Sequence, residues 1–567
     1  MLSYACQEGD IALAELCLRR GEDANQQPGL VTPLIQASAS GNIRLVELLL
    51  KHNAKPNLQT IDGVSPLMIA SYAGHTKVAK LLLEYGAKVD LQENGGTSAL
   101  MRAGSKGHTD LMKLLLEHGA QVDLRRKDGM TVLMLASQKG HTKVVKLLLL
   151  YRAKADAQNN DGISAIMFAS EGGYTEIVKI LHHYGAKVDT QNNEGVSALI
   201  VASQNGHSEL IKLLFEYKTR VNLQNYDGWT ALMSACQSGH SKVVELKYGA
   251  EVDMQTNDGW TALTAASQNG HVEVVKLLHQ YGAQVDLQDI SGRSALFFAC
   301  SNGYVKLVRL LLKYGAQANQ EALEFRVSPL MIASQNGHAE IVKLLYEYGA
   351  QVNLQRKDGV TAMITASETG HTDVIKLLHE YGAKADVHTF DGWSALHAAS
   401  QYGHTKIVKL LLEYGVQIDL RDTLEGVTGL MLASQNGHTE IVKFLLGHRA
   451  QVSVQCINGM SALMIASQAG HTEIVKLLLD HGAQVNVQNH HGTSALILAC
   501  KNGHADIVKL LKEYGAQTED DLISLFVARF HGHINVMKMF SEIIQTQKHQ
   551  ENTKTGRSTS LPQPDKV

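Results

Sequence analysis

Apolar and polar residues follow one another along this chain in a block pattern that returns about every 33 residues. Each block holds a short apolar run, a glycine, a longer run with apolar residues at helical spacing, and a second glycine. The first glycine recurs at fifteen positions from Gly41 to Gly503, with weaker copies at Gly9 and Gly532, which gives seventeen units. A fixed period of this length indicates a stacked solenoid, in which each unit buries its apolar face against its neighbours.

The residues 459–488 illustrate the structure that one block predicts. Ser461 precedes an apolar stretch and is placed to cap the N-terminus of a short helix, which Gly470 ends in the left-handed conformation. A second helix comes next, with a wide apolar face over 474–479, and Gly482 stops it. An extended arm then leads to the next turn. Elsewhere Pro33, Pro66 and Pro329 take the first helical position, which favours proline.

These sequence motifs resemble the ankyrin repeat. Its Thr-Pro-Leu-His-x-Ala motif appears here as Thr32-Pro33-Leu34, as Ser65–Ala70 and, with the histidine, as Ser394–Ala399. The resemblance covers roughly residues 2–544. It implies an all-α repeat solenoid, a curved superhelix of stacked helix-turn-helix units with projecting β-hairpin fingers. It implies no catalysis, because the usual work of the family is to bind other proteins.

The ends of the chain differ from its middle, as the caps of a repeat array must. We expect a capping partial repeat over 1–28, an array of about 15 repeats over 29–521, and a capping helix pair over 522–544. The polar residues 545–567 are predicted to be disordered.

Interruptions of the period are informative. The step from Gly239 to Gly270 is 31 residues, so the short unit near 239–250 lacks two core residues of its second helix. Either this helix shortens, or the array gains a hinge there; an error in the gene model is a third explanation. Two other steps are 34 residues, with finger insertions at 320–326 and 421–426.

Composition and charge reduce the range of partners that we expect for this chain. The net charge is −3 and no basic stripe is visible, so we expect neither nucleic-acid binding nor attraction to an anionic membrane. No apolar run reaches the ~20 residues of a spanning helix. The six cysteines show no CxxC pairing and are interpreted as small buried residues in a reducing, cytoplasmic setting.

Candidate chemistry is sparse. The sequence has no phosphate-binding loop, GxSxG elbow or HExxH motif, so we expect no enzyme activity, no cofactor and no metal. The Gly-His histidines fall one per unit, too far apart to share one zinc ion, and are interpreted as structural. Methionine replaces the family's histidine in eight units. We interpret it as filling a half-buried core slot, the alternatives being a promiscuous binding stripe or a methionine metal site: Met68, Met101, Met134, Met167, Met233, Met331, Met431 and Met464.

The aromatic residues are the better candidates for a site. All three tryptophans directly follow Asp-Gly at a predicted fingertip, a position that the resemblance assigns to the concave binding surface. Exposed aromatic side chains are common interface anchors, although each could instead pack on its neighbouring finger. The predicted protein-binding residues form two sets: Tyr226, Trp229 and Trp260, and then Phe390, Trp393 and Tyr402.

The sequence therefore predicts a protein-binding scaffold of soluble, cytoplasmic type, which binds partners through its concave face and fingers. The alternative is a regulatory or targeting subunit, or substrate adaptor, of an enzyme such as a phosphatase or ubiquitin ligase. That role would need a docking motif, for which 545–567 is the only free segment. A mechanical, membrane-linked array is disfavoured because no spanning segment is present.

Overall fold

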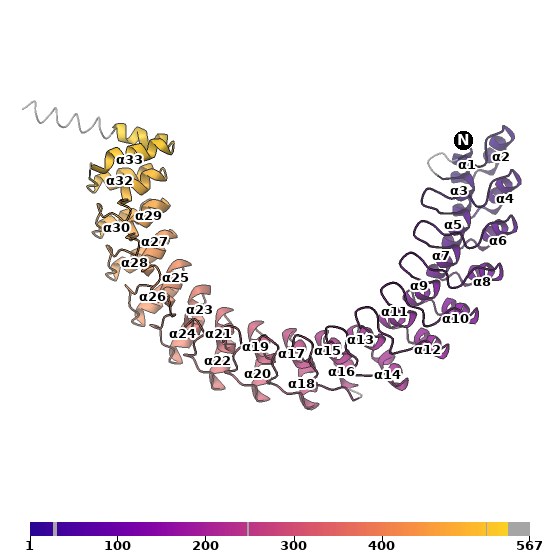
Figure 1. The fold of residues 1–567 in the computed structure, drawn as a ribbon, viewed down its shortest axis with the longest axis horizontal. Helices are drawn as coiled ribbons and strands as arrows, with labels where there is room; N and C mark the ends of the chain where they lie inside the picture. Colours follow the sequence, from indigo (N-terminus) through magenta and orange to yellow (C-terminus); the bar gives the residue numbers. More distant parts are fainter. Residues whose placement is uncertain (27–30, 247–248, 518, 543–567) are drawn as a thin grey trace, which may run out of the picture. The chain divides into compact units, whose positions relative to one another are not determined.

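The computed structural model describes residues 1–26, 31–246, 249–517 and 519–542. Within these residues the chain is a succession of antiparallel helix pairs joined by finger-like loops (Figure 1). The pairs α1–α32, followed by α33 and the helical residues 534–542, correspond to the seventeen predicted units. The predicted all-α repeat solenoid is confirmed. Among the described residues, the fingers carry at most single bridges, such as that between Gln92 and Ser98.

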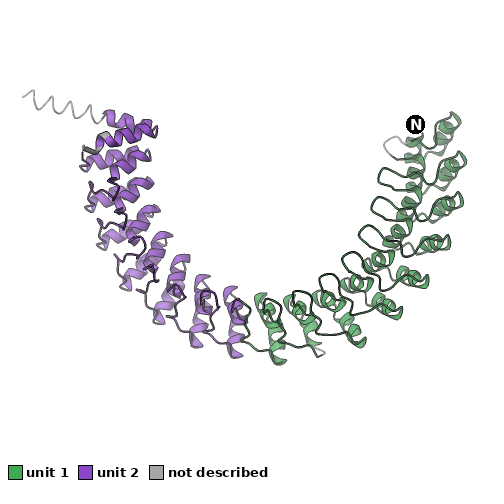
Figure 2. Ribbon diagram, viewed as in Figure 1, with its two compact units in different colours: residues 1–290 green, residues 291–567 purple. Residues whose placement is uncertain are grey.

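The chain divides into two compact units, residues 1–290 and 291–567, and the 33-residue period does not change at their boundary (Figure 2). In unit 1 the first helices of the pairs are α1 (Leu2–Glu8), α3 (Pro33–Ser40), α5 (Pro66–Ala73), α7 (Ala99–Lys106), α9 (Val132–Gln138), α11 (Ala165–Glu171), α13 (Ala198–Gln204), α15 (Ala231–Gln237) and α17 (Ala262–Gln268). The second helices are α2 (Ile11–Arg19), α4 (Ile43–Lys51), α6 (Thr76–Glu84), α8 (Thr109–Glu117), α10 (Thr142–Leu150), α12 (Thr175–His183), α14 (Ser208–Glu216), α16 (Ser241–Glu245) and α18 (Val272–Gln280).

Unit 2 repeats this arrangement. Its first helices are α19 (Ala295–Ser301), α21 (Pro329–Gln335), α23 (Ala362–Thr369), α25 (Ala395–Gln401), α27 (Gly429–Gln435), α29 (Ala462–Ala469) and α31 (Ala495–Lys501). Its second helices are α20 (Val305–Lys313), α22 (Ala339–Glu347), α24 (Thr372–Glu380), α26 (Thr405–Glu413), α28 (Thr439–Gly447), α30 (Thr472–Asp480) and α32 (Ala505–Glu513), and α33 (Glu519–Phe530) follows. Within each unit the first helices and the fingers lie on the same side of the stack (Figure 1). The predicted tail 545–567 lies outside the described residues.

Local signals set the helix ends as predicted. The Ser461 hydroxyl accepts the backbone N–H of Met464 at the start of α29, and Gly470 ends this helix at φ 87°. The second helices usually stop before a left-handed glycine, which four units replace by another residue. These residues still adopt positive φ, between 57° and 66°, and they are Asn53, Arg152, Lys218 and Arg449.

Glycine and histidine of successive units interlock. Gly437 has a φ of 77°, and a Cβ built on it would lie 2.7 Å from the His471 ring of the next unit. The Nε2 atom of His471 is 3.1 Å from the carbonyl oxygen of Gln435 and hydrogen-bonds to it. The same pairing recurs in both compact units of the chain. In unit 1, for example, it joins Gly41 to His75 of the next repeat. The Gly-His histidines therefore connect successive repeats of the stack, in agreement with their structural interpretation.

Polar side chains join the fingers. The Nε2 group of Gln224 donates to the carbonyl of Gly228 in its own finger (2.7 Å) and to that of Gln255 in the next (3.0 Å). The Asn353 side chain accepts the backbone N–H of Lys384 (2.9 Å), which lies at the base of the next finger. Each finger is therefore held by its neighbours.

The methionines and cysteines belong to the core. The eight methionines are at most 3% exposed, so they fill a fully buried slot, rather than the half-buried one expected, and present no binding stripe. The six cysteines are free and buried, as predicted. Burial raises the pKa of the Cys6 and Cys500 thiols to about 12, and it also raises those of Cys236 and Cys300. Such thiols are inert in the folded chain.

The 31-residue unit has a shortened second helix. Helix α16 has five residues, whereas the neighbouring α14 and α18 each have nine. It lacks a counterpart of the fully buried Leu214 and Leu278. A small apolar cavity of about 20 Å³ lies beside it, lined by residues that include Phe215, Leu232 and Val243. Residues 247 and 248 lie outside the described residues, so the choice between a shortened helix and a hinge stays a prediction.

Among the residues described, no helix combines the length and the apolar character needed to cross a membrane.

Candidate functional site

The three tryptophans lie at equivalent positions of their fingers, each directly after the fingertip glycine and each half-buried. In unit 1 the backbone N–H of Trp229 donates to the Asn225 side chain (2.7 Å). Tyr226 is 70% exposed, and its carbonyl accepts a hydrogen bond from Asn257 in the next finger, which carries Trp260. The first predicted set is thus placed on two consecutive, linked fingers.

In unit 2 the Trp393 indole is held in a fixed position. Its backbone N–H donates to the Thr389 hydroxyl (2.9 Å), and its ring stacks on the buried His397. Phe390 is 71% exposed at the fingertip, while Tyr402 stacks on His404 at a centroid distance of 6.4 Å. The structure therefore gathers these residues in one repeat but gives each a different neighbour.

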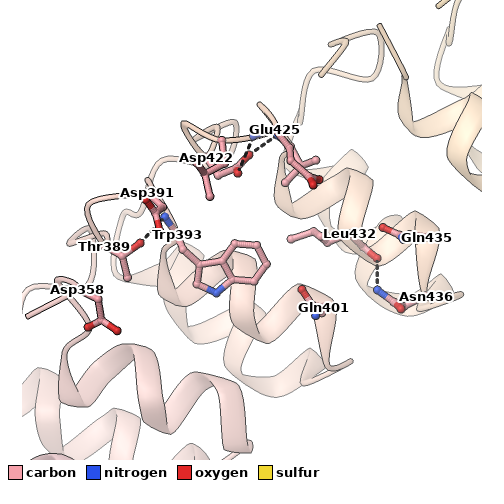
Figure 3. A pocket seen from close by; sticks show the side chains of 12 residues that line it. Asp358, Thr389, Asp391, Trp393, Gln401, Asp422, Glu425, Leu432, Gln435 and Asn436 are labelled. Carbon is pink, nitrogen blue, oxygen red and sulfur yellow. Dashed lines mark hydrogen bonds between the residues drawn. The ribbon is translucent and has the colours of Figure 1, made fainter. Parts of the chain in front are cut away.

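Trp393 lines a pocket of about 500 Å³ between fingers and first helices. Its indole projects toward Leu432 on α27 and Gln401 on α25 (Figure 3). Phe390 and Tyr402 do not line this pocket. The twelve lining residues are Asp358, Thr389, Asp391, Trp393, Gln401, Asp422, Leu424, Glu425, Val427, Leu432, Gln435 and Asn436.

The 421–426 insertion builds one wall of the pocket. Asp422 is 8% exposed, and its carboxylate accepts the backbone N–H groups of Glu425 (3.1 Å) and Val427 (2.6 Å), which fixes the loop (Figure 3). Arg421 stands where most other fingers have glutamine. It donates to Gly426 (3.2 Å) in its own finger and to Gln455 (2.7 Å) in the next. The longer arginine side chain thus spans the inserted residue and keeps the links between fingers.

The pocket is acidic. Four of its lining residues carry carboxylates and none is basic. Asp358 is paired with Arg356 (2.7 Å), and Asp422 is engaged by the loop backbone. Within the described part of the chain, no hydrogen bond or ion pair engages the side chains of Asp391 and Glu425. These two carboxylates are available to a ligand.

The described residues contain no group of three or more His, Cys, Asp or Glu side chains that could hold a metal ion. The chemistry available around Trp393 is therefore an aromatic face, an apolar patch and carboxylates that are not gathered around one point.

A second pocket of about 370 Å³ continues the first and shares Glu425, Val427 and Gln435 with it. Met460 and Ile465 give it an apolar surface. The two pockets together form a groove along consecutive fingers.

The carboxylates and Leu432 were not predicted from the sequence. Trp393 and the 421–426 insertion stand out there only as separate features of consecutive repeats. Their positions in the repeat could have indicated that they lie close together, because both belong to fingertips and the two fingertips are one period apart.

Comparison with protein-family models agrees with this architecture. A family model for ankyrin repeats (3 copies) matches seven stretches, residues 2–93, 88–161, 166–256, 243–322, 330–422, 418–489 and 482–552. The crystal structure of the human ASB11 ankyrin repeat domain is similar at 30% sequence identity. The similarity covers 40% of this chain and 99% of that one, with a TM-score of 0.36. No curated protein matches.

Proposed function

The chain belongs to the ankyrin repeat family, whose repeats are generally protein–protein interaction modules, and from this premise we propose that it is a scaffold without catalytic activity of its own. It binds partner proteins through the finger loops and the first helices, the surface that forms the concave face in this family. The observation that carries the proposal is the groove around Trp393, where a fixed indole lies beside carboxylates that have no partner within the described chain.

Aromatic anchors surrounded by polar residues are the usual makeup of an interface. Tyr226 and Phe390 expose about 70% of their surface at fingertips, and each stands in the same repeat as a half-buried tryptophan. Two such patches, one in each unit, would allow a partner with two binding segments to gain affinity through multivalent contact.

Site-specific photo-crosslinking tests the binding surface. A photoreactive amino acid at Tyr402, at the end of the first helix α25, is compared with one at the similarly exposed Tyr348, at the end of the second helix α22. We expect partner proteins to crosslink at position 402 and not at 348. Crosslinking confined to 348 would contradict the proposal.

The first aromatic set is tested in the same assay. Trp229→Ala combined with Trp260→Ala should weaken partner capture while the helix content, measured by circular dichroism, stays unchanged. Unchanged capture would remove this patch from the proposed surface.

The alternative role, a regulatory subunit or substrate adaptor of an enzyme, places a docking motif in 545–567, outside the described residues. Deletion of these residues separates the two roles. Loss of an enzymatic partner with retention of other partners would favour the adaptor.

A further inference from the structure

We propose that the pocket around Trp393 accepts the guanidinium group of an arginine in an extended segment of a partner protein. The indole serves as an aromatic platform, and Asp391 and Glu425 supply the opposite charge. This inference deepens the proposed function and rests on it.

The aromatic platform is fixed before any ligand arrives. The Trp393 ring lies on His397 at a centroid distance of 5.4 Å, and His397 is in turn hydrogen-bonded to the carbonyl of Val427 in the next finger (3.2 Å). A cation placed over the face of an indole is attracted by the ring quadrupole, and tryptophan is the best aromatic partner for it. Little conformational entropy is lost on binding because the ring is already oriented.

The charge of the pocket selects a cation. With Asp358 paired and Asp422 used by its own loop, the carboxylates of Asp391 and Glu425 remain for a ligand. A metal ion does not fit this arrangement, because no three candidate ligands among the described residues converge. An extended planar cation does fit, since it can stack on an indole while its N–H groups reach separate acceptors.

Arginine is favoured over lysine for the same reason. The guanidinium group stacks on aromatic faces, carries five donors and is more weakly hydrated than an ammonium group. The amides of Gln401, Gln435 and Asn436 line the pocket and offer further acceptors.

The adjoining pocket indicates a second side chain of the bound segment. Packed helices are spaced about 8–10 Å apart, and an extended chain in the polyproline II conformation advances about 3.1 Å per residue and returns to the same side every third residue, so about three residues span one repeat. The second pocket presents Met460 and Ile465. The segment recognised should therefore carry an apolar side chain three positions from the arginine.

The experiment uses the full chain with Trp229→Phe and Trp260→Phe, which leaves Trp393 as the only tryptophan. The probes are two twelve-residue peptides of glycine and serine that carry one arginine and one leucine three positions apart, in either order. Controls replace the arginine by lysine or by citrulline, its uncharged isostere. Trp393 fluorescence reports occupancy of the pocket, and labelled-peptide anisotropy reports affinity.

We expect one of the arginine peptides to change Trp393 fluorescence and to bind more weakly as salt rises. The citrulline peptide should bind about tenfold more weakly, and the lysine peptide should fall between the two. Equal binding of the arginine and citrulline peptides would overturn the proposal, and so would the absence of any fluorescence change.

Two sets of variants locate the effect. Asp391→Asn with Glu425→Gln changes exposed side chains only, and it should weaken arginine-peptide binding about tenfold. Asp258→Asn is the matched control, because Asp258 precedes Gly-Trp at the same fingertip position in unit 1. Equal weakening by the control would mean non-specific attraction and would overturn the proposal.

The outcome separates this inference from the proposed function. If crosslinking at position 402 persists while the arginine peptides do not bind, the inference fails and the scaffold stands. If crosslinking at 402 is also absent, the proposed binding surface fails with it.

Discussion

The indole of Trp393 stacks on the imidazole of His397, with ring centroids 5.4 Å apart and planes inclined by 27°. His397 is 1% exposed. Its Nδ1 atom hydrogen-bonds with the hydroxyl (2.8 Å) and the backbone N–H (3.2 Å) of Ser394, and its Nε2 atom with the Val427 carbonyl (3.2 Å). It is the one histidine at a position where eight repeats have methionine. A single buried ring thus connects the aromatic platform to Val427 of the next finger, which also lines the pocket.

This contact predicts a pH dependence. Burial lowers the pKa of His397 below its ordinary value of 6.5, although its bond to the Val427 carbonyl opposes the shift. The unfolded state therefore binds the proton more readily, and the stability that neutral His397 contributes is present above pH 6.5 and is lost as pH falls toward the folded-state pKa. Between pH 6.5 and 5.5 the loss is at most about 1.4 kcal/mol.

The measurement is urea unfolding of the single-tryptophan chain, followed by Trp393 fluorescence at pH 5.5 and 7.5. The control is the same chain with His397→Met, the residue that most repeats carry. At pH 7.5 this substitution should destabilise by about 1 kcal/mol, because it removes one of the two hydrogen bonds to the Val427 carbonyl, whose other donor is the Asp422 backbone N–H. The difference between the two proteins should shrink at pH 5.5, and a difference independent of pH would contradict the prediction.

The interlock of Gly437 with His471 predicts a strong coupling. Gly437→Ala forces a Cβ against the His471 ring and strains a residue with a φ of 77°, at a cost of about 2 kcal/mol. His471→Ala removes the ring, so the double variant should be more stable than the two single effects predict when added. Gly447→Ala in α28 is the control. A Cβ there meets nothing within 4 Å, and stability should stay the same or rise.

Two equivalent cysteines can report on the shortened helix. Cys236 on α15 and Cys300 on α19 are fully buried, and burial raises the pKa of both thiols. Alkylation then requires local opening, which should cost about 1–2 kcal/mol less beside the five-residue α16. We expect iodoacetamide to label Cys236 roughly 5–30 times faster than Cys300, as measured by peptide mass spectrometry. Labelling of Cys300 at an equal or higher rate would contradict the prediction that the repeat with the shortened helix opens more easily.

The same repeat should be repairable. Insertion of Leu-His after Leu246 restores the usual spacing and returns a leucine to the position that Leu278 fills in the next unit. Filling the cavity should slow hydrogen exchange in α14 and α15, with a gain of about 1–2 kcal/mol. The same insertion after Leu277 displaces a helix that is already complete and should accelerate exchange there.

The repeat architecture could be predicted from sequence because its signals are local and recur in every unit. Ser461 and Gly470 cap α29 as their residue types and spacing indicate, and even Arg152 and Lys218 keep the left-handed conformation of the glycine they replace. Where seventeen copies agree, tertiary context has little room to override propensity.

The pocket could not be predicted in this way. It depends on how the 421–426 loop folds back on Asp422, which places Glu425 across from Trp393. Backbone bonds to a buried carboxylate are a tertiary feature, and residue types alone do not reveal them. The role of Tyr226, Trp229 and Trp260 in binding stays a prediction.

The joint between Gly437 and His471 also bears on how such a gene can change. The histidine ring, the carbonyl that it hydrogen-bonds and the glycine that leaves room for it recur along the chain. Removal of one whole 33-residue period therefore brings together two surfaces that already match. Unequal recombination between copies can therefore lengthen or shorten the protein without creating a faulty junction. Residues that only a few repeats have, such as the tryptophans, are then retained, while the number of repeats that separates them changes.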